Sequence, residues 1–134
     1  MKIKMSKLEE EWKKKLSKQQ FRVLRDRITE MPFSGRFLRN KEKGFYVCAG
    51  CSNKLFSSEV KFDSGTGWPS FYNALPNAVE KVPDESHGLH RIEIICSKCK
   101  GHLGHFFEDG PNPNGRRYCV NSVSLEFKKK NSRG

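Results

Sequence analysis

The beginning of the chain carries a helical pattern of hydrophobic and polar positions. Apolar side chains recur three or four residues apart, at Leu8 and Trp12 and again at Phe21, Leu24 and Ile28. This spacing places them on one face of a helix, with polar residues between them. The pattern predicts helical structure through about the first thirty residues.

The sequence also marks where these helices begin and end. Ser6 is followed three residues later by Glu9, and Ser17 is followed in the same way by Gln20. In such a pair each side chain accepts a hydrogen bond from the other residue's backbone N–H, which favours the start of a helix. Pro32 lacks a backbone donor, so it is predicted to end the helical segment.

From Gly44 onward the chain changes to short β-rich segments separated by clusters of Gly, Pro, Asn and Asp. Four of these segments are predicted as strands, namely Gly44–Ala49, Val79–Val82, Leu89–Cys96 and Tyr118–Phe127. In the last one, every second residue from Cys119 to Phe127 falls on one face. The sequence therefore predicts a helical lead followed by a mostly antiparallel β domain.

Composition supports one folded domain with basic ends. The 134 residues include ten Phe, two Trp and three Tyr, which is too many aromatics for a disordered chain. The net charge of +11 is concentrated in residues 1–18 and 128–134, which carry +4 each. We therefore predict a basic N-terminal lead over 1–18, helical or partly disordered, a single domain over 19–127 and a basic C-terminal tail over 128–134.

Two classes of protein are excluded by the sequence. No stretch approaches the roughly 18 apolar residues of a membrane span. The N-terminus is charged throughout and lacks the apolar region of a signal peptide. These features predict a cytoplasmic protein without a membrane partner, whose thiols stay reduced.

Four of the five cysteines form two matched pairs with the spacing of metal ligands. Cys48 and Cys51 make one C-x-x-C motif, and Cys96 and Cys99 make another after a gap of 44 residues. Four thiolates are the ligand set of a closed, structural zinc site, so one zinc ion is predicted here. Two alternatives are redox-active C-x-x-C pairs, which need a βαβ context that is not evident, and unrelated buried cysteines.

The fifth cysteine stands apart from these pairs. Cys119 follows Arg117, whose charge would favour the thiolate, and Asn121 shares its face of the predicted strand. His102 and His105 follow the second cysteine pair, and a cysteine with histidines elsewhere is a general pattern for a nucleophile. From these residues alone, Cys119 is equally well a small buried side chain, and the histidines are equally well core or zinc-neighbouring residues.

Taken together, the motifs resemble those of the B-type methionine sulfoxide reductases. The similarity runs from about residue 7 to 127 and rests on motifs in the same order. These motifs are Cys48-x-x-Cys51, Ser64-Gly65-Thr66-Gly67-Trp68-Pro69-Ser70-Phe71, Cys96-x-x-Cys99, Gly101-His102-Leu103-Gly104-His105-x-Phe107 and Arg117-Tyr118-Cys119-Val120-Asn121-Ser122.

The resemblance implies two antiparallel β-sheets with short N-terminal helices, held together by a four-cysteine zinc site. It implies reduction of the R epimer of methionine sulfoxide, with Cys119 as the nucleophile and Trp68, otherwise a packed turn aromatic, against the substrate methyl group. The polar side of the pocket would be lined by His102, His105, Arg117 and Asn121. Because a sulfoxide reacts only when its oxygen is protonated or strongly hydrogen-bonded, we expect His105 to be the principal acid, supported by His102.

One position departs from the pattern of many family members. Their Ser-Gly-Cys-Gly-Trp-Pro turn carries a cysteine that resolves the oxidised nucleophile, and this chain has Thr66 there. The resemblance therefore implies a one-cysteine enzyme whose Cys119 sulfenic acid is reduced by an external thiol, either thioredoxin-like or a small molecule. We expect a monomer that repairs methionine sulfoxide in peptides or proteins after oxidative stress.

Two other functions remain as alternatives. The first is a non-catalytic zinc-binding β module that binds nucleic acid or acidic protein through the Lys-rich ends. The nearly balanced charge of residues 19–127 and the lack of interleaved basic and aromatic residues argue against nucleic acid. The second is a binding protein that has lost the chemistry, which would not need Arg117, Cys119 and Asn121 together.

Overall fold

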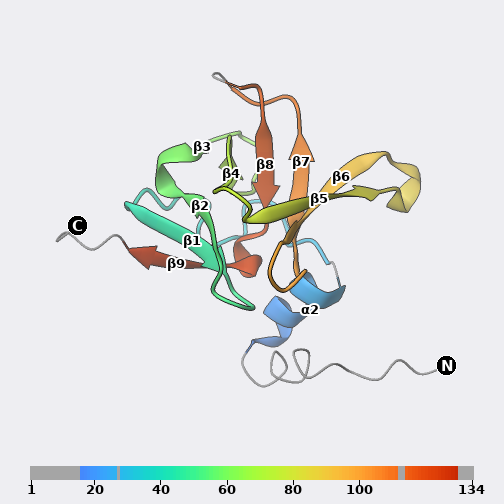
Figure 1. Ribbon diagram of the computed structural model, residues 1–134, viewed down its shortest axis with the longest axis horizontal. Coiled ribbons are helices and arrows are strands. Elements are labelled where there is room, and N and C mark those ends of the chain that lie inside the picture. The colour runs from blue at the N-terminus through green and yellow to red at the C-terminus, as the bar shows by residue number, and fades with distance from the viewer. Residues whose placement is uncertain (1–15, 27, 112–113, 130–134) are drawn as a thin grey trace.

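Two antiparallel sheets form most of the protein. The structure, a computed structural model, describes residues 16–26, 28–111 and 114–129. One sheet has three strands in the order β2-β1-β9, and the other has six in the order β3-β4-β8-β7-β6-β5. The two sheets lie side by side, with the helix α2 below them in the view of Figure 1. The predicted mostly β fold with two antiparallel sheets is confirmed.

The bounds of the elements follow chain order. The helix and strands are α2 (Lys18–Asp26), β1 (Gly44–Cys48), β2 (Lys54–Ser57), β3 (Lys61–Phe62), β4 (Ser70–Phe71), β5 (Val79–Asp84), β6 (Arg91–Cys96), β7 (His102–Phe107), β8 (Arg117–Val120) and β9 (Leu125–Lys129). Short 3-10 turns occupy Ser58–Val60, Ser86–Gly88 and Ser122–Ser124. Within the described ranges no helix is long and apolar enough to cross a membrane.

Helix α2 begins at the predicted capping pair. The hydroxyl of Ser17 accepts a hydrogen bond from the Gln20 N–H (3.1 Å), and the Gln20 side chain accepts one from the Ser17 N–H (2.9 Å). Leu24 is buried, as the amphipathic pattern predicts. The prediction for Ile28 is wrong, because the helix ends at residue 26 and Ile28 is 45% exposed.

The reason lies in how the helix ends. The N–H of Ile28 bonds the carbonyl of Arg22, whereas a continuing helix would have it bond the carbonyl of Leu24. The other predicted helical features, the Ser6 and Glu9 cap and the Leu8 and Trp12 pair, lie outside the described residues.

Three of the four predicted strands match β1, β5 and β6, but the prediction of one strand over Tyr118–Phe127 is wrong. That segment divides into β8 and β9, which belong to different sheets. Polar side chains at the break bond the backbone of neighbouring segments. The Asn121 amide donates to the Leu103 carbonyl, and the Ser124 hydroxyl donates to the His102 carbonyl. These bonds hold the turn that carries the chain from one sheet to the other.

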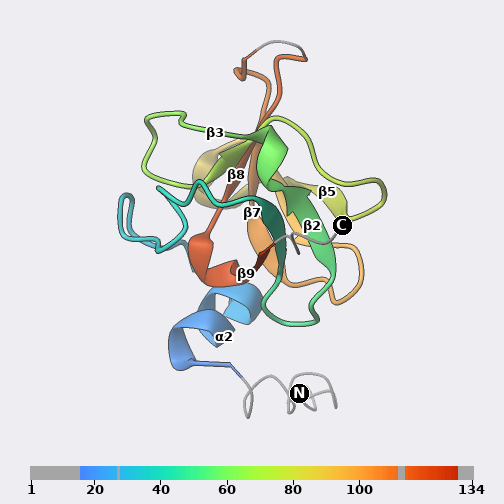
Figure 2. The same cartoon turned by 90° about the vertical axis from the view of Figure 1, so that its left-hand side faces the viewer.

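An aromatic core fills the space between the two sheets. Phe56 of β2 stacks on Phe71 of β4 with ring centroids 4.3 Å apart, and Tyr46 of β1 meets the same Phe71 ring edge-on at 5.2 Å. Phe56 also contacts Tyr118 of β8. Figure 2 shows the two sheets from the side, with β2 and β9 in front of the larger sheet. Because these rings are buried and come from both sheets, they fix how the sheets pack.

Candidate active site and metal centre

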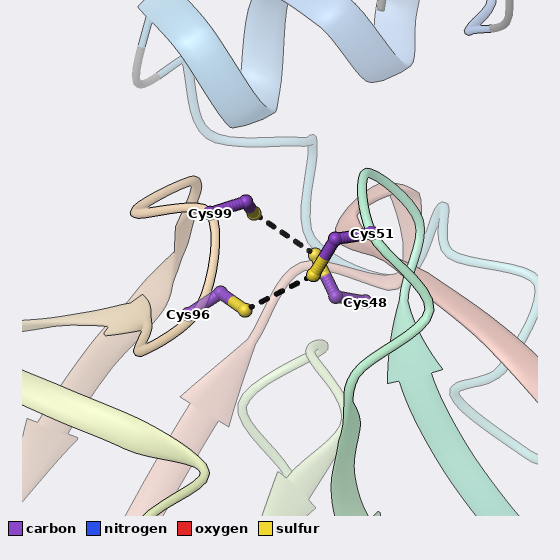
Figure 3. A group of neighbouring side chains, drawn as sticks. All are labelled: Cys48, Cys51, Cys96 and Cys99. Atoms are coloured by element: carbon purple, nitrogen blue, oxygen red, sulfur yellow. Dashed lines mark hydrogen bonds between the residues drawn. The ribbon is translucent and has the colours of Figure 1, made fainter. Parts of the chain in front are cut away.

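The four paired cysteines converge on one point, as Figure 3 shows. Their sulfur atoms all lie within 4.8 Å of one another, with Cys48 and Cys99 sulfurs 3.6 Å apart and Cys51 and Cys96 sulfurs 3.5 Å apart. Tetrahedral zinc with Zn–S bonds of about 2.3 Å places its sulfur ligands about 3.8 Å apart. The cluster therefore fits one zinc ion, and the predicted four-cysteine metal site is confirmed.

Both cysteine pairs sit in the same kind of turn. The residue after the second cysteine, Ser52 in one pair and Lys100 in the other, has a φ of +66° and +65° respectively. Each of these residues donates its N–H to the carbonyl of the first cysteine, at 2.8 Å in both turns. The repeated geometry aims two sulfurs from each turn at the same place.

The metal site joins the two sheets. Cys48 ends β1 in the three-stranded sheet, and Cys96 ends β6 in the six-stranded sheet. A zinc ion held by both turns would tie the two sheets at this end of the core. Four thiolates leave no coordination position for water or substrate, so the ion would be structural.

Cys119 lies at the centre of the larger sheet. It occupies β8, directly opposite Ser70 of β4 on one side and His105 of β7 on the other. Opposite residues in an antiparallel sheet share a face, so Cys119 and His105 lie next to each other. Gly104 permits this close approach of the strands, because a Cβ atom at that position would overlap the carbonyl group of Cys119.

A small pocket of about 100 Å³ opens over Cys119. It can take the end of one side chain, not a whole peptide. The residues that line it are Thr29, Trp68, Arg91, Gly104, His105, Phe107, Cys119, Val120 and Asn121. Four residues proposed from the sequence thus meet there, whereas His102 and Arg117 do not line it.

Cys119 is a protonated thiol near neutral pH, because its pKa is raised above the ordinary value. Burial raises its pKa, and this effect outweighs the Arg117 charge and the hydrogen bonds from Thr66 and Arg117, all of which lower it. Thr66, in the turn before Trp68, is therefore in contact with the Cys119 thiol. Its hydroxyl is also 2.7 Å from that of Ser64, which in turn bonds the hydroxyl of Ser70.

His105 is held by a carboxylate that the sequence did not point to. Its Nε2 lies 2.7 Å from Oδ2 of Asp84 in β5, and the Ser86 hydroxyl also bonds that carboxylate. Together the Ser86 and His105 contacts lower the pKa of Asp84, so it is ionised near neutral pH. Nε2 of His105 therefore carries the proton, which leaves Nδ1 for substrate or water.

The surroundings keep the His105 ring neutral. Burial lowers its pKa most, and the nearby charges of Arg91 and His102 act in the same direction. The hydrogen bond to Asp84 opposes them only in part. The resting pair at the pocket is thus a neutral thiol, Cys119, beside a neutral imidazole.

His102 lies behind His105 and away from the pocket. It is 2% exposed, and its Nδ1 is 2.7 Å from Oε2 of the buried Glu93. The two histidine rings are 5.7 Å apart, although residues three apart on a regular strand point to opposite faces. A register shift between β6 and β7 accompanies this arrangement.

Trp68 is fixed at the pocket wall by the segment that precedes the first strand. Its indole N–H donates to the carbonyl of Glu30 at 3.0 Å. The N–H of Glu30 in turn donates to the Asn121 side chain, and the buried Glu30 carboxylate accepts from the N–H of Val123. Asn121 therefore lines the pocket while its amide ties this segment to the turn after β8.

Arg117 approaches Cys119 from the side. Its guanidinium makes two hydrogen bonds to the carboxylate of Asp109, at 2.8 and 3.1 Å, and lies over the ring of Phe107 at 4.3 Å. These contacts hold the charge where it lowers the pKa of the Cys119 thiol. Asp109, like Asp84, was not identified from the sequence, because both are brought to the site only by the folding of the sheet.

Three relatives match the chain over most of its length. The peptide methionine sulfoxide reductase MsrB of Leptospira interrogans is 54% identical over 130 residues, covering 96% of this chain and 99% of the relative. The MsrB of Methanosarcina barkeri is 58% identical over 125 residues, covering 92% and 88%. The MsrB of Bradyrhizobium diazoefficiens is 52% identical over 128 residues, covering 95% and 92%.

The family comparison agrees with these relatives. Residues 16–129 match the SelR domain, a range that contains both cysteine pairs, the pocket and Cys119. This range and the near full-length matches to the relatives show that the chain belongs to the SelR domain family.

Proposed function

We propose that this protein reduces the R epimer of methionine sulfoxide in peptides or proteins to methionine. The observation that carries the proposal is the pocket. Cys119, the one cysteine that does not belong to the metal cluster, lies beside His105 in this pocket, and Trp68 forms part of its wall. The space fits the end of one side chain. The curated relatives bear the name of peptide methionine sulfoxide reductases, which agrees with this chemistry.

The first step moves one oxygen atom. The sulfoxide S–O bond breaks, an S–O bond forms at Cys119, and methionine leaves as the thioether. The substrate sulfur gains two electrons and the Cys119 sulfur loses two, giving a sulfenic acid. The thiol proton of Cys119 ends on the transferred oxygen, so no other redox partner takes part in this step.

His105 supports the proton movement in this step. Its Nδ1 is unprotonated while Asp84 holds the proton on Nε2. His105 can therefore accept the thiol proton as Cys119 attacks and deliver it to the sulfoxide oxygen. Because the thiol and the imidazole are both neutral beforehand, little thiolate is present near neutral pH until a substrate oxygen can receive the proton.

Shape separates the two epimers. An apolar methyl group fits the Trp68 ring, while the sulfoxide oxygen needs the polar side near His105. With the sulfur facing Cys119, only one of the two epimers can place its methyl group on Trp68 and its oxygen near His105 at the same time. Asn121 acts as a positioning residue here, because its bonds to Glu30 and Leu103 hold Trp68 and β7 relative to each other.

The second step requires an external thiol. The other four cysteines belong to the metal cluster, and Thr66 occupies the turn next to Cys119. Two equivalents of a small or protein thiol would return the sulfenic acid to Cys119 thiol, with one disulfide and one water as products. A reducing compartment such as the cytoplasm supplies such thiols and keeps the zinc ligands reduced.

The test is turnover of separated R and S epimers of a methionine sulfoxide peptide with dithiothreitol. We expect turnover of the R epimer only, and none above background with Cys119→Ser. Intact mass after one turnover without reductant should show the gain of one oxygen. Failure to reduce either epimer would overturn the proposed function, and full activity of Cys119→Ser would overturn the role of Cys119.

A further inference from the structure

A second and larger hollow of about 820 Å³ begins beside the active-site pocket. We call it the basic groove. Its walls include Phe33, Leu38, Arg39, Lys41, Phe62 and Gly67. Phe33 is 59% exposed, and its neighbour Met31 is 74% exposed, so a large apolar surface faces solvent at one end of the groove. Exposed apolar surface beside a reaction pocket is typical of a binding site.

The groove and the pocket share one stretch of chain. Gly67 lines the groove, and the next residue, Trp68, lines the pocket. The N–H of Phe33 donates to the Gly67 carbonyl at 2.6 Å, and a Cβ atom on Gly67 would meet the Phe33 ring at 2.9 Å. A chain that leaves the pocket past Trp68 therefore reaches Phe33 and then the groove.

The charge of the groove is predominantly positive. Arg39, Lys41 and Lys61 line it, against a single lining carboxylate, Asp63. The Asp63 carboxylate accepts a hydrogen bond from the N–H of Gly65, and the Lys61 ammonium donates to the Leu38 carbonyl. Arg39 and Lys41 are exposed and make no ion pair with any residue in the described part of the chain. Their charges are thus available to a ligand.

We propose that the basic groove binds the peptide chain of the substrate on one side of its methionine sulfoxide, and that it favours acidic residues there. The proposal rests on the proposed function, since it needs a sulfoxide side chain in the pocket. The pocket admits only the side-chain end, so the rest of the peptide must lie on the adjoining surface. Arg39 and Lys41 would contact the acidic residues, and Phe33 the backbone or apolar neighbours.

The experiment compares two peptides of equal length with a central R sulfoxide, one with flanking Asp and one with flanking Lys. N-acetyl-methionine-amide R-sulfoxide is too short to enter the groove and serves as the reference. Dithiothreitol is the reductant throughout, so a charge effect on a protein reductant cannot contribute. Each kcat/KM for a peptide is divided by that for the reference on the same variant.

We expect the acidic peptide to exceed the basic one by about tenfold at low salt, through KM and not kcat, and the ratio to shrink at high salt. The double variant Arg39→Glu with Lys41→Glu should invert the order. The matched control, Lys18→Glu with Arg22→Glu, changes the same charge on α2. This helix lies far from β3 in Figures 1 and 2 and contributes no residue to the groove. The control should keep the wild-type order.

The outcomes separate the two proposals. An unchanged order in the groove variant, with the reference still reduced, would overturn the groove and leave the function intact. Equal kcat/KM values for the two peptides on the wild-type protein would also overturn the groove proposal and leave the proposed function intact. Failure of the wild-type protein to reduce the reference and both peptides would instead overturn the proposed function.

Discussion

The carboxylate of Asp84 holds Nε2 of His105 at 2.7 Å although 21 residues separate them in the chain. Asp84 ends β5, and His105 lies in β7, with β6 between them in the sheet. The contact fixes the ring tautomer, because an ionised carboxylate accepts the Nε2 proton. The nitrogen that is left for proton transfer is thus decided by a residue two strands away.

Replacing Asp84 should therefore move the pH dependence of the reaction. Burial, Arg91 and His102 already lower the pKa of His105, and the Asp84 contact is what raises it. Asp84→Asn removes this opposing contact, so the pKa of His105 should fall further. The acidic limb of kcat/KM, which requires neutral His105, should shift to lower pH, and the maximal rate should fall about tenfold to a hundredfold. The measurement is a pH–rate profile with the R-sulfoxide peptide. Glu85→Gln, an exposed neighbour, should leave the limb in place, and an unshifted limb in Asp84→Asn would contradict the assignment.

The reactivity of Cys119 should report its surroundings in the free protein. Because burial raises its pKa, the rate of alkylation by iodoacetamide should keep rising above the ordinary thiol pKa of 9.0. Arg117→Gln removes a charge that lowers this pKa, so the rate at pH 7 should fall further, by about tenfold. Arg116→Gln, at the exposed neighbouring position, is the matched control. Faster alkylation in Arg117→Gln than in the control would contradict this account.

Removing the metal should loosen the link between the sheets. A chelator under reducing conditions is expected to lower the melting temperature by about 10 °C or more, since structural zinc binding contributes to folding free energy. Cys96→Ser should lose zinc, measured by metal analysis, whereas Cys119→Ser should retain it. An unchanged melting temperature after complete zinc removal would count against the structural role.

The contact between Thr66 and Cys119 predicts what a new cysteine would do there. In Thr66→Cys the added thiol would lie beside the sulfenic acid and condense with it, with loss of water. Intact mass after one turnover should then show the loss of two hydrogens in place of the gain of one oxygen. The same substitution in a Cys119→Ser background should show neither change. A persistent sulfenic acid in Thr66→Cys would mean that the two side chains do not meet during turnover.

The parts of the fold that the sequence predicts are those with a local signal. The Ser17 and Gln20 cap and the two C-x-x-C turns are complete within a few residues, and all appear in the structure. Strand β7 has no such signal, because Gly101-His102-Leu103-Gly104-His105 lacks the β-branched residues typical of strands. It is held as a strand by its pairing with β6 and β8.

The predicted long strand and the two missed carboxylates have one cause, because both depend on strand pairing that neighbouring residues do not reveal. The alternating pattern from Cys119 to Phe127 predicts a single strand, but the chain turns at Ser122–Ser124. The core-facing positions also change there, from Tyr118 and Val120 in β8 to Leu125 in β9. Asp84 and Asp109 reach the site by strand pairing alone, and no residue beside them in sequence marks them as special. Cysteine spacing therefore predicts the metal ligands, and the family resemblance adds Cys119 as the proposed nucleophile. The carboxylates that contact His105 and Arg117 depend on sheet pairing instead.

The division of the last segment into β8 and β9 has a consequence for synthesis on the ribosome. Strand β1, which carries Cys48, pairs with β9, so its sheet stays incomplete until residues 125–129 have emerged. Contacts between such distant segments form late. The metal turns would therefore close onto a finished framework only after β9 has been made, which couples metallation to the synthesis of that strand. A nascent chain stalled before β9 should bind zinc weakly and be vulnerable to oxidation of its exposed thiols.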